Sequence, residues 1–376
     1  MEEGNTLKPR LLSLDFFRGL TVAAMILVNN PGDWAHIYAP FEHAAWNGCT
    51  PTDLIFPFFL FIVGVSIVFA MDSAKNDPSN HPRLLKSIAR RTAILFGLGL
   101  FLSLFPFFDF SIVRIPGVLQ RIAVVYFVCA ILFIKVNQRI LFRCFISFTL
   151  LYWLLMILVP VPDFGPANLD LGTNLGAYID RTVFGLNHVW KNAKTWDPEG
   201  LLSTLPAIST GLFGVLMGII LKSKLRTPEN KVIWLFTYGF LAVLLGLFWD
   251  LFFPINKSLW SSSFVLYTGG IASMFLALCY WLIDVQGFTK FTRPFVVYGV
   301  NAITVFFVSG IIGRVLTLVK VGGGQQALTL KAYIYNSVFT PLLAPYNASL
   351  AYAIMFVLFW YAILWVMYKK NIIIKV

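Results

Sequence analysis

The stretch FEHAAWNGCTPTDLIFPFFLFIVG, residues 41–64, decides the class of fold. Its second half is apolar and opens a run long enough to cross a lipid bilayer as a helix. Its first half places His43, Trp46, Asn47 and Asp53 immediately before that run or just inside it. An ionisable group at the mouth of a membrane span costs free energy, so we expect His43 and Asp53 to belong to a functional site.

The composition of the whole chain agrees with a membrane protein. Of its 376 residues, 58% are hydrophobic and only 12% are charged, and the mean hydropathy is +0.78. Soluble domains carry about 25% charged residues. The sequence predicts an all-α, polytopic transmembrane bundle, a single domain over residues 1–376, whose first run is a retained helix rather than a signal peptide. The ten predicted spans are 13–30, 52–72, 88–106, 115–134, 140–160, 203–221, 232–253, 262–283, 295–317 and 347–368.

Lysine and arginine are distributed unequally between the two sets of loops. Nineteen lie in one set of segments (8–10, 75–91, 135–143, 222–231, 290–293 and 369–375) and seven in the other. Because basic loops stay on the cytoplasmic side, both termini are predicted to be cytoplasmic, in an inner membrane, with the His43 loop outside. The same bias explains the net charge of +12, so no nucleic-acid partner is needed to account for it. The basic loops are also expected to attract anionic lipid headgroups or an anionic cytosolic substrate.

Candidate catalytic residues lie in the first two spans and the loop between them. His43 is predicted to act as a general base, although a hydrogen bond to a loop carbonyl would also explain it. Asp53 can cap the second span, or it can orient the imidazole of His43. Asn29 can donate its amide to a developing oxyanion, and Asn30 is the competing choice. Asp15, three residues before Arg18, is expected to pair with it inside the membrane margin.

Several other polar residues interrupt apolar sequence. Arg121, beside Gln120, lies in the fourth span, where it is expected to face a polar cavity, a substrate or an acid such as Asp53. The longest segment between spans, 161–202, is predicted to be a functional loop. Two outer motifs combine tryptophan with amide, acid or lysine side chains and are candidate substrate contacts: WDPEGLLSTLP, with Asp197 and Glu199, and FPINKSLWSSSF, with Asn256, Lys257 and Trp260. No metal or nucleotide motif is present, and the four cysteines do not suggest a disulfide framework.

Seven ordered motifs together resemble the heparan-alpha-glucosaminide N-acetyltransferase family, and in particular its bacterial relatives. They are LDFFRGL (14–20), LVNN (27–30), EHAAWNGCTPTDLIFPFFLFIVG (42–64), GVLQRIAVVYF (117–127), DPEGLLSTLPAI (197–208), PINKSLWSSSFVL (254–266) and YGVNAI (298–303). The resemblance implies transfer of acetyl from cytosolic acetyl-CoA to the amino group of a terminal glucosamine across the membrane. It places the catalytic histidine at His43 and the catalytic asparagine at Asn29, although the spacing between them exceeds that of the lysosomal enzyme.

On this interpretation acetyl-CoA is a co-substrate, and no metal is required. Its candidate contacts are Arg121, Gln120, Arg18 and Asn301. The acceptor, an amino sugar or glycan, is expected to contact Trp46, Asn47, Asp197, Glu199, Asn256, Lys257 and Trp260. The lipid bilayer is the other predicted partner, and a homodimer is compatible with the sequence. Two alternatives remain open: a solute transporter in which Arg121, Asp15 and Asp53 form a relay, and an O-acyltransferase of envelope polysaccharide.

Overall fold

A computed structural model describes residues 11–322 and 327–374. Within these residues, nine helices are long and apolar enough to cross a membrane, or ten if one bent pair counts as a single span. The predicted all-α class is confirmed, and the orientation in the membrane stays a prediction. Of the basic residues used for it, Lys8, Arg10 and Lys375 lie outside the described residues.

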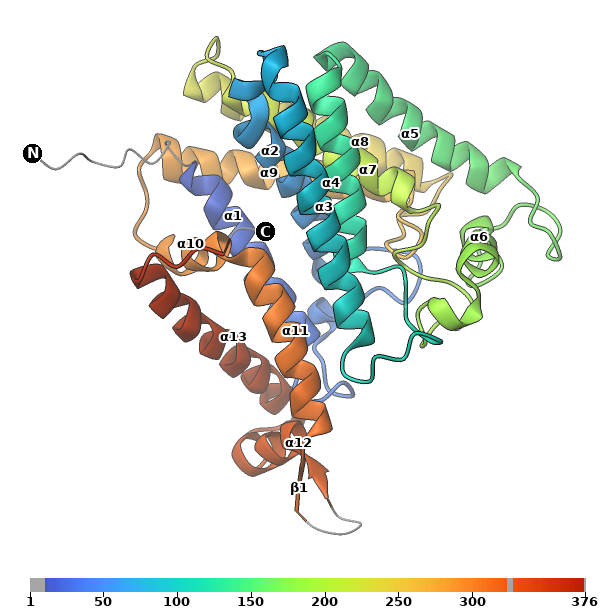
Figure 1. Cartoon of the computed structure of the whole chain (residues 1–376), viewed down its shortest axis with the longest axis vertical. Coiled ribbons are helices and arrows are strands. Elements are labelled where there is room, and N and C mark those ends of the chain that lie inside the picture. Colours follow the sequence, from blue (N-terminus) through green and yellow to red (C-terminus); the bar gives the residue numbers. More distant parts are fainter. Residues whose placement is uncertain (1–10, 323–326, 375–376) are drawn as a thin grey trace, which may run out of the picture.

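The helices are joined by tight turns and by several longer loops (Figure 1). The long ones are α1 (Leu12–Asn29), α2 (Ile55–Lys75), α3 (His81–Leu104), α4 (Val118–Lys135), α5 (Gln138–Leu158), α7 (Thr204–Lys222), α8 (Pro228–Asp250), α9 (Ser262–Cys279, continued by the π-helix Tyr280–Val285) and α13 (Pro345–Lys369). Shorter elements are α6 (Leu175–Phe184), α10 (Arg293–Val300), α11 (Ala302–Leu318), α12 (Leu330–Ile334), the π-helix Tyr335–Phe339 and the antiparallel pair β1 (Lys320–Val321) and β2 (Leu328–Thr329). Short 3₁₀ turns cover Ala39–Phe41, Pro51–Leu54, Pro78–Asn80 and Leu186–His188.

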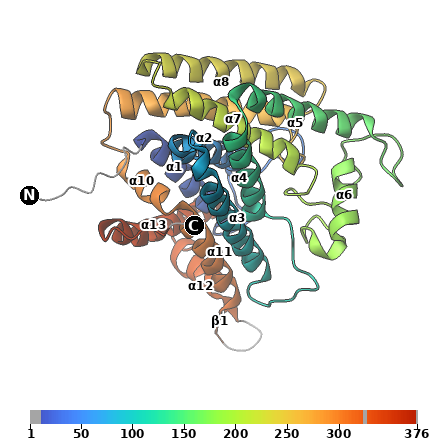
Figure 2. The same cartoon turned by 45° about the horizontal axis from the view of Figure 1, so that its top comes forward.

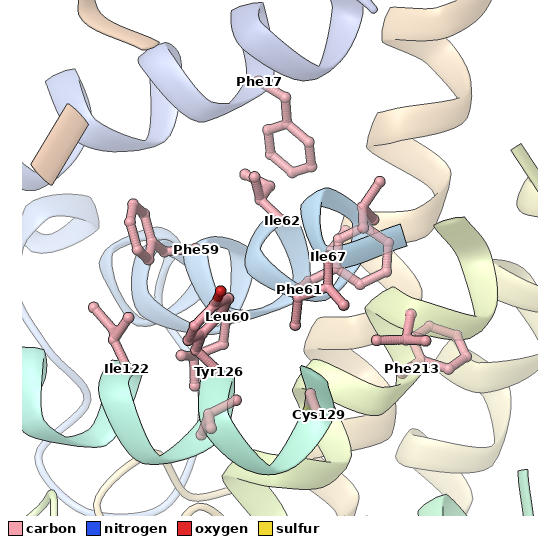
Figure 3. Packing of buried hydrophobic residues seen from close by; sticks show 14 of the residues in the cluster. Phe17, Phe59, Leu60, Phe61, Ile62, Ile67, Ile122, Tyr126, Cys129 and Phe213 are labelled. Atoms are coloured by element: carbon pink, nitrogen blue, oxygen red, sulfur yellow. The ribbon is translucent and has the colours of Figure 1, made fainter. Parts of the chain in front are cut away.

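Helix α2 lies at the centre of the hydrophobic core. Figure 3 shows its apolar side chains, Leu60 among them, surrounded by Phe17 of α1, Ile122 and Tyr126 of α4, and Phe213 of α7. Helices α2 and α7 approach so closely that a Cβ on Gly64 would lie 2.0 Å from the carbonyl oxygen of Gly211. Small residues permit such packing in membranes, where dispersion contacts between helices replace the hydrophobic effect. This packing holds α2 in place, and the 3₁₀ turn directly before it carries Asp53.

The span predicted at 295–317 differs from a single continuous helix. Helices α10 and α11 meet at an angle of 81° at Asn301. The Asn301 amide donates to the carbonyl oxygen of Ile372 (3.1 Å) and accepts from the backbone N–H of Ile374 (3.0 Å). Its side chain therefore ties the break to the segment after α13, which explains how a helix can be interrupted here.

The segment 161–202, predicted to be a loop, contains helix α6 and is well packed. Trp190 and Trp196 meet edge to face with ring centroids 6.0 Å apart. Buried Asp180 of α6 accepts from the backbone N–H groups of Asp197 (3.2 Å) and Leu201 (2.9 Å). The segment is thus a folded cap over one end of the bundle.

Candidate active site

Three segments that are far apart in the sequence meet at the end of the bundle where α2, α7 and α9 begin. The backbone N–H of Gly48 donates to the carbonyl oxygen of Ile255 (2.7 Å), and the Asn256 amide donates to the Asn47 side-chain oxygen (3.1 Å). The Trp46 indole donates to the carbonyl oxygen of Leu169 (3.1 Å). The loop carrying His43 is therefore held by both other segments.

Asp53 caps a helix and also contacts His43, so its geometry is compatible with both roles that the sequence left open. Its side chain is 1% exposed. One carboxylate oxygen, Oδ2, accepts from the backbone N–H groups of Thr50 (3.0 Å) and Ala44 (3.1 Å), which forms a capping box with Thr50. The other oxygen, Oδ1, lies 2.7 Å from Nδ1 of His43. A carboxylate held in this way is a rigid acceptor for the imidazole.

His43 is open to solvent on the side away from Asp53, since 53% of its side chain is exposed. Asp53 as a carboxylate can only accept hydrogen bonds, so the proton of the neutral imidazole lies on Nδ1. The lone pair of Nε2 is then the acceptor of the imidazole, and Nζ of Lys257 lies 3.1 Å from it. The pair has the arrangement of a general base oriented by an acid.

Lys257 adds a third ionisable group to this pair. Its Nζ lies 2.9 Å from Nδ1 and 3.1 Å from Nε2 of His43, and 3.6 Å from Oδ1 of Asp53. Burial lowers the pKa of Lys257, and the charges of Asp53 and Glu199 oppose that effect. Because Nδ1 cannot donate to Asp53 and accept from Lys257 at once, the proton positions in the three groups are linked.

The predicted substrate contacts Asp197 and Glu199 have a partner within the protein. The Arg114 guanidinium donates to both oxygens of Asp197, at 2.8 and 2.5 Å, and also to Glu199. Burial raises the pKa of neighbouring Asp180 to about 7. This network holds Trp196 edge to face against Trp46, 5.5 Å between centroids. Arg114 was not among the sequence candidates, because it lies in the loop between α3 and α4 with no local pattern to mark it.

Arg121 is fully buried, and the expectation that it might pair with Asp53 is wrong. Within the described residues its guanidinium donates to the Gly200 carbonyl oxygen (3.1 Å) and the Ser203 hydroxyl, and forms no ion pair. The guanidinium carbon lies 5.1 Å from the ring centre of buried Trp260, whose indole donates to Thr210 (3.1 Å). Arg121 and Trp260 therefore support the ends of the segments that carry Glu199 and Lys257.

The two asparagines at the end of α1 are in different environments. The Asn30 amide donates to the carbonyl oxygen of Ile26 (2.8 Å) and so completes the helix end. Asn29 is exposed and lines a cavity of about 330 Å³ together with Arg314 and Lys331. Asn30 lines the same cavity, with its amide nitrogen engaged by Ile26, so the choice between the two asparagines stays open. No described hydrogen bond links Asn29 to His43, so its catalytic role stays a prediction.

Of the remaining candidate cofactor contacts, Arg18 and Asn301 have hydrogen-bond partners, whereas the buried Nε2 of Gln120 has none among the described residues. Arg18 pairs with Asp15 (2.9 Å), as predicted, and also donates to Ser66 (2.9 Å). The side chain of buried Gln120 packs where Gly99 leaves space beside it. Asn301 binds the segment after α13, as described above. Their proposed role toward acetyl-CoA stays a prediction.

Two further observations concern the side chains of this site. Burial raises the pKa of Cys49, which lies near Asp53 and Lys257, to about 12, so its thiol stays protonated at neutral pH. Across residues 11–322 and 327–374, no group of three or more histidine, cysteine, aspartate or glutamate side chains could hold a metal ion. His43 is the most exposed member of the His43–Asp53–Lys257 cluster.

These features define a polytopic helical membrane protein with a His–Asp–Lys cluster at one end of its bundle. Comparison with known proteins specifies the family. Residues 10–170 match the model described as "Heparan-alpha-glucosaminide N-acetyltransferase, catalytic". The human heparan-alpha-glucosaminide N-acetyltransferase is 33% identical over 355 residues, and the mouse protein is 32% identical over 350. The alignments cover 80% and 79% of this chain. The chain belongs to the heparan-alpha-glucosaminide N-acetyltransferase family, and it spans about half the length of these curated relatives, 53% of each.

Proposed function

We propose that this protein is a transmembrane acetyltransferase that moves acetyl from cytosolic acetyl-CoA to the amine of a terminal, glucosamine-like sugar outside. The observation that carries the proposal is the His43–Asp53–Lys257 cluster at the predicted outer end of the bundle. His43 and Asp53 lie inside the region matched by the catalytic model of the family. The names of the human and mouse relatives supply the reaction class and the type of acceptor.

In this mechanism the nitrogen of the acceptor amine attacks the thioester carbonyl, and His43 Nε2 takes a proton from that amine. The new C–N bond forms as the C–S bond breaks, and His43 returns the proton to the departing thiolate. Asp53 keeps the imidazole in the Nδ1–H tautomer. The Lys257 ammonium lies where it can stabilise negative charge on the carbonyl oxygen, a role that Asn29 would share if it approaches the site. Transfer through an acetylated Nε2 would use the same lone pair.

Sided vesicles test the proposal. Labelled acetyl-CoA is added to the cytoplasmic face of inverted vesicles that contain glucosamine, and we expect labelled N-acetylglucosamine inside. His43→Ala should abolish the label without preventing membrane insertion, since loss of a general base costs about 10² to 10⁴ in rate. The matched control is His36→Ala, which removes the histidine of another His–Asp pair in the same loop (His36 Nδ1 to Asp33 Oδ2, 2.6 Å).

Three outcomes would contradict the proposal. Activity of His43→Ala within a few-fold of the parent protein would exclude His43 as the general base. Labelling of an acceptor whose amine is already blocked would indicate a hydroxyl acceptor and an O-acyltransferase. Accumulation of unmodified glucosamine that depends on Arg121, Asp15 and Asp53 would indicate a transporter.

A further inference from the structure

A large cavity is lined by residues other than those of the His43 cluster. It is a groove of about 1380 Å³ between α5, α7 and α8, which lie together at one side of the molecule (Figures 1 and 2). Phe213 and Leu216 of α7 line it, with Ile146 of α5 and Leu245 of α8 on either side. Its lining is therefore apolar over most of its length.

One end of the groove is strongly basic. Arg139 and Arg143 lie in the first turns of α5, and Arg226 lies just before α8, so all three are at the same end. Among the described residues lining the groove there is no carboxylate, and none of these arginines has an ion pair in the described part of the chain. The Arg226 guanidinium stacks on the Trp234 ring, 5.0 Å from its centre. This end carries three uncompensated positive charges at the predicted cytoplasmic surface.

The other end is aromatic. Trp153 of α5 and Trp249 of α8 meet edge to face with centroids 5.3 Å apart. Fourteen residues of helix separate Arg139 from Trp153, which corresponds to roughly 21 Å along the axis. That is more than half of the ~30 Å hydrocarbon thickness of a bilayer. The groove therefore starts at headgroup level and continues deep into the hydrocarbon region.

We propose that this groove binds one anionic phospholipid of the cytoplasmic leaflet. The phosphate-bearing headgroup contacts Arg139, Arg143 and Arg226, because guanidinium groups pair with phosphate oxygens in a bidentate geometry. An acyl chain lies along the apolar walls toward Trp153 and Trp249. An amphiphile of this kind matches both ends of the groove, whereas in a zwitterionic lipid such as phosphatidylcholine the choline cation offsets the phosphate charge, so the three positive charges of the groove stay uncompensated. The proposal does not depend on the acetyltransferase reaction.

Native mass spectrometry of the full chain tests the proposal. Delipidated protein is titrated with phosphatidylglycerol or with phosphatidylcholine in a neutral detergent. We expect one phosphatidylglycerol per chain, bound at least about tenfold more tightly than phosphatidylcholine. The triple variant Arg139→Gln, Arg143→Gln, Arg226→Gln should lose that preference. Its matched control is Arg83→Gln, Lys86→Gln, Arg90→Gln, which removes the same charge from exposed positions on α3 and should keep it.

A second variant tests the groove without changing charge. Ile146→Trp fills its middle and should weaken binding of both lipids, even if the triple variant proves unstable. Unchanged preference in the triple variant, or unchanged binding to Ile146→Trp, would overturn the proposal. Displacement of phosphatidylglycerol by acetyl-CoA would assign the arginines to a nucleotide instead. A third outcome would also overturn the proposal: the protein forms a dimer that binds no lipid, and Ile146→Trp abolishes that dimer. The groove would then be an interface between two copies of the chain.

Discussion

Asp53→Asn separates the two roles of Asp53. The asparagine oxygen can still accept from the backbone N–H groups of Thr50 and Ala44, which keeps the capping contribution of about 1 kcal/mol. Its NH₂ group then faces Nδ1 of His43, which lies 2.7 Å from the Asp53 oxygen in the parent protein. Because an amide N–H can only donate, Nδ1 must become the acceptor and the imidazole proton moves to Nε2. The base lone pair is lost while the helix cap remains.

We therefore expect Asp53→Asn to melt within a few degrees of the parent protein but to lose about 10² to 10⁴ in acetyl transfer rate. Lys257 loses its carboxylate partner, but it can adjust by releasing a proton, since burial already lowers its pKa. Asp53→Ala removes both roles and should lose activity together with about 1 kcal/mol of unfolding free energy.

The measurements are thermal unfolding and sided acetyl transfer on the same preparations. Asp33→Asn is the control, because it alters the other His–Asp pair of the loop, and it should keep near-parental turnover. Turnover of Asp53→Asn within a few-fold of the parent protein would refute the orienting role. If Asp53→Asn lowered the unfolding free energy as much as Asp53→Ala does, the asparagine would not preserve the helix cap.

Four further predictions concern other groups. Lys257→Met should lower turnover about 10²-fold, with partial recovery in Lys257→Arg, since it removes a cation beside the reacting atoms; unchanged turnover would exclude that role. Arg121→Gln should lower the unfolding free energy by about 2–4 kcal/mol and leave turnover within a few-fold, because the Arg121 guanidinium contacts Gly200 and Trp260 of the protein itself. Unchanged stability together with a large loss of turnover would instead indicate that Arg121 contacts acetyl-CoA. The folded-state pKa of Asp180, about 7, lies above its ordinary value of 3.8, so the folded state binds the proton more tightly than the unfolded state does. The free energy of unfolding should therefore fall as pH rises from about 4 to 7. Asp180→Asn should abolish that slope, on the order of 2–4 kcal/mol, in melting curves at pH 5 and 8. Cysteines at Ala35 and Leu225, both exposed, should react with an impermeant reagent from opposite faces, and reaction from one face would refute the predicted orientation.

The long helices were predictable from the sequence because each is an apolar run that must satisfy its own backbone hydrogen bonds in lipid. The break at Asn301 was not, since Asn301 is one polar residue in a mostly apolar segment and its partners lie about 70 residues further along the chain. Helix α6 does carry local signals. Asn174 caps its start by accepting from the backbone N–H of Ala177, and Gly185, with a φ of 76°, follows its end. It was missed because its ten residues lie in a segment rich in glycine, proline and asparagine, which was predicted to be a loop.

The candidate site likewise contains residues that could be identified from the sequence and residues that could not. His43 and Asp53 are ten residues apart and adjoin a helix start, so a cap and an imidazole partner could be inferred from one stretch of sequence. Lys257 was singled out only as part of a motif, and its distance of 2.9 Å from His43 requires the 251–261 segment to fold back over the loop. Arg114 had no signal, because its two acid partners lie more than 80 residues further along the chain.

The arrangement of charges around His43 explains why the cluster needs all of its parts. Lys257 alone would hold its ammonium against an imidazole, and Asp53 alone would be a buried anion, which is costly without a partner. Together they compensate each other, and with its proton on Nδ1 the imidazole directs its Nε2 lone pair toward Lys257. The Arg114 contacts fix the segment that carries Glu199, whose charge also acts on Lys257. A substitution of Arg114 should therefore lower turnover through Lys257, and it should have no further effect in a His43→Ala background.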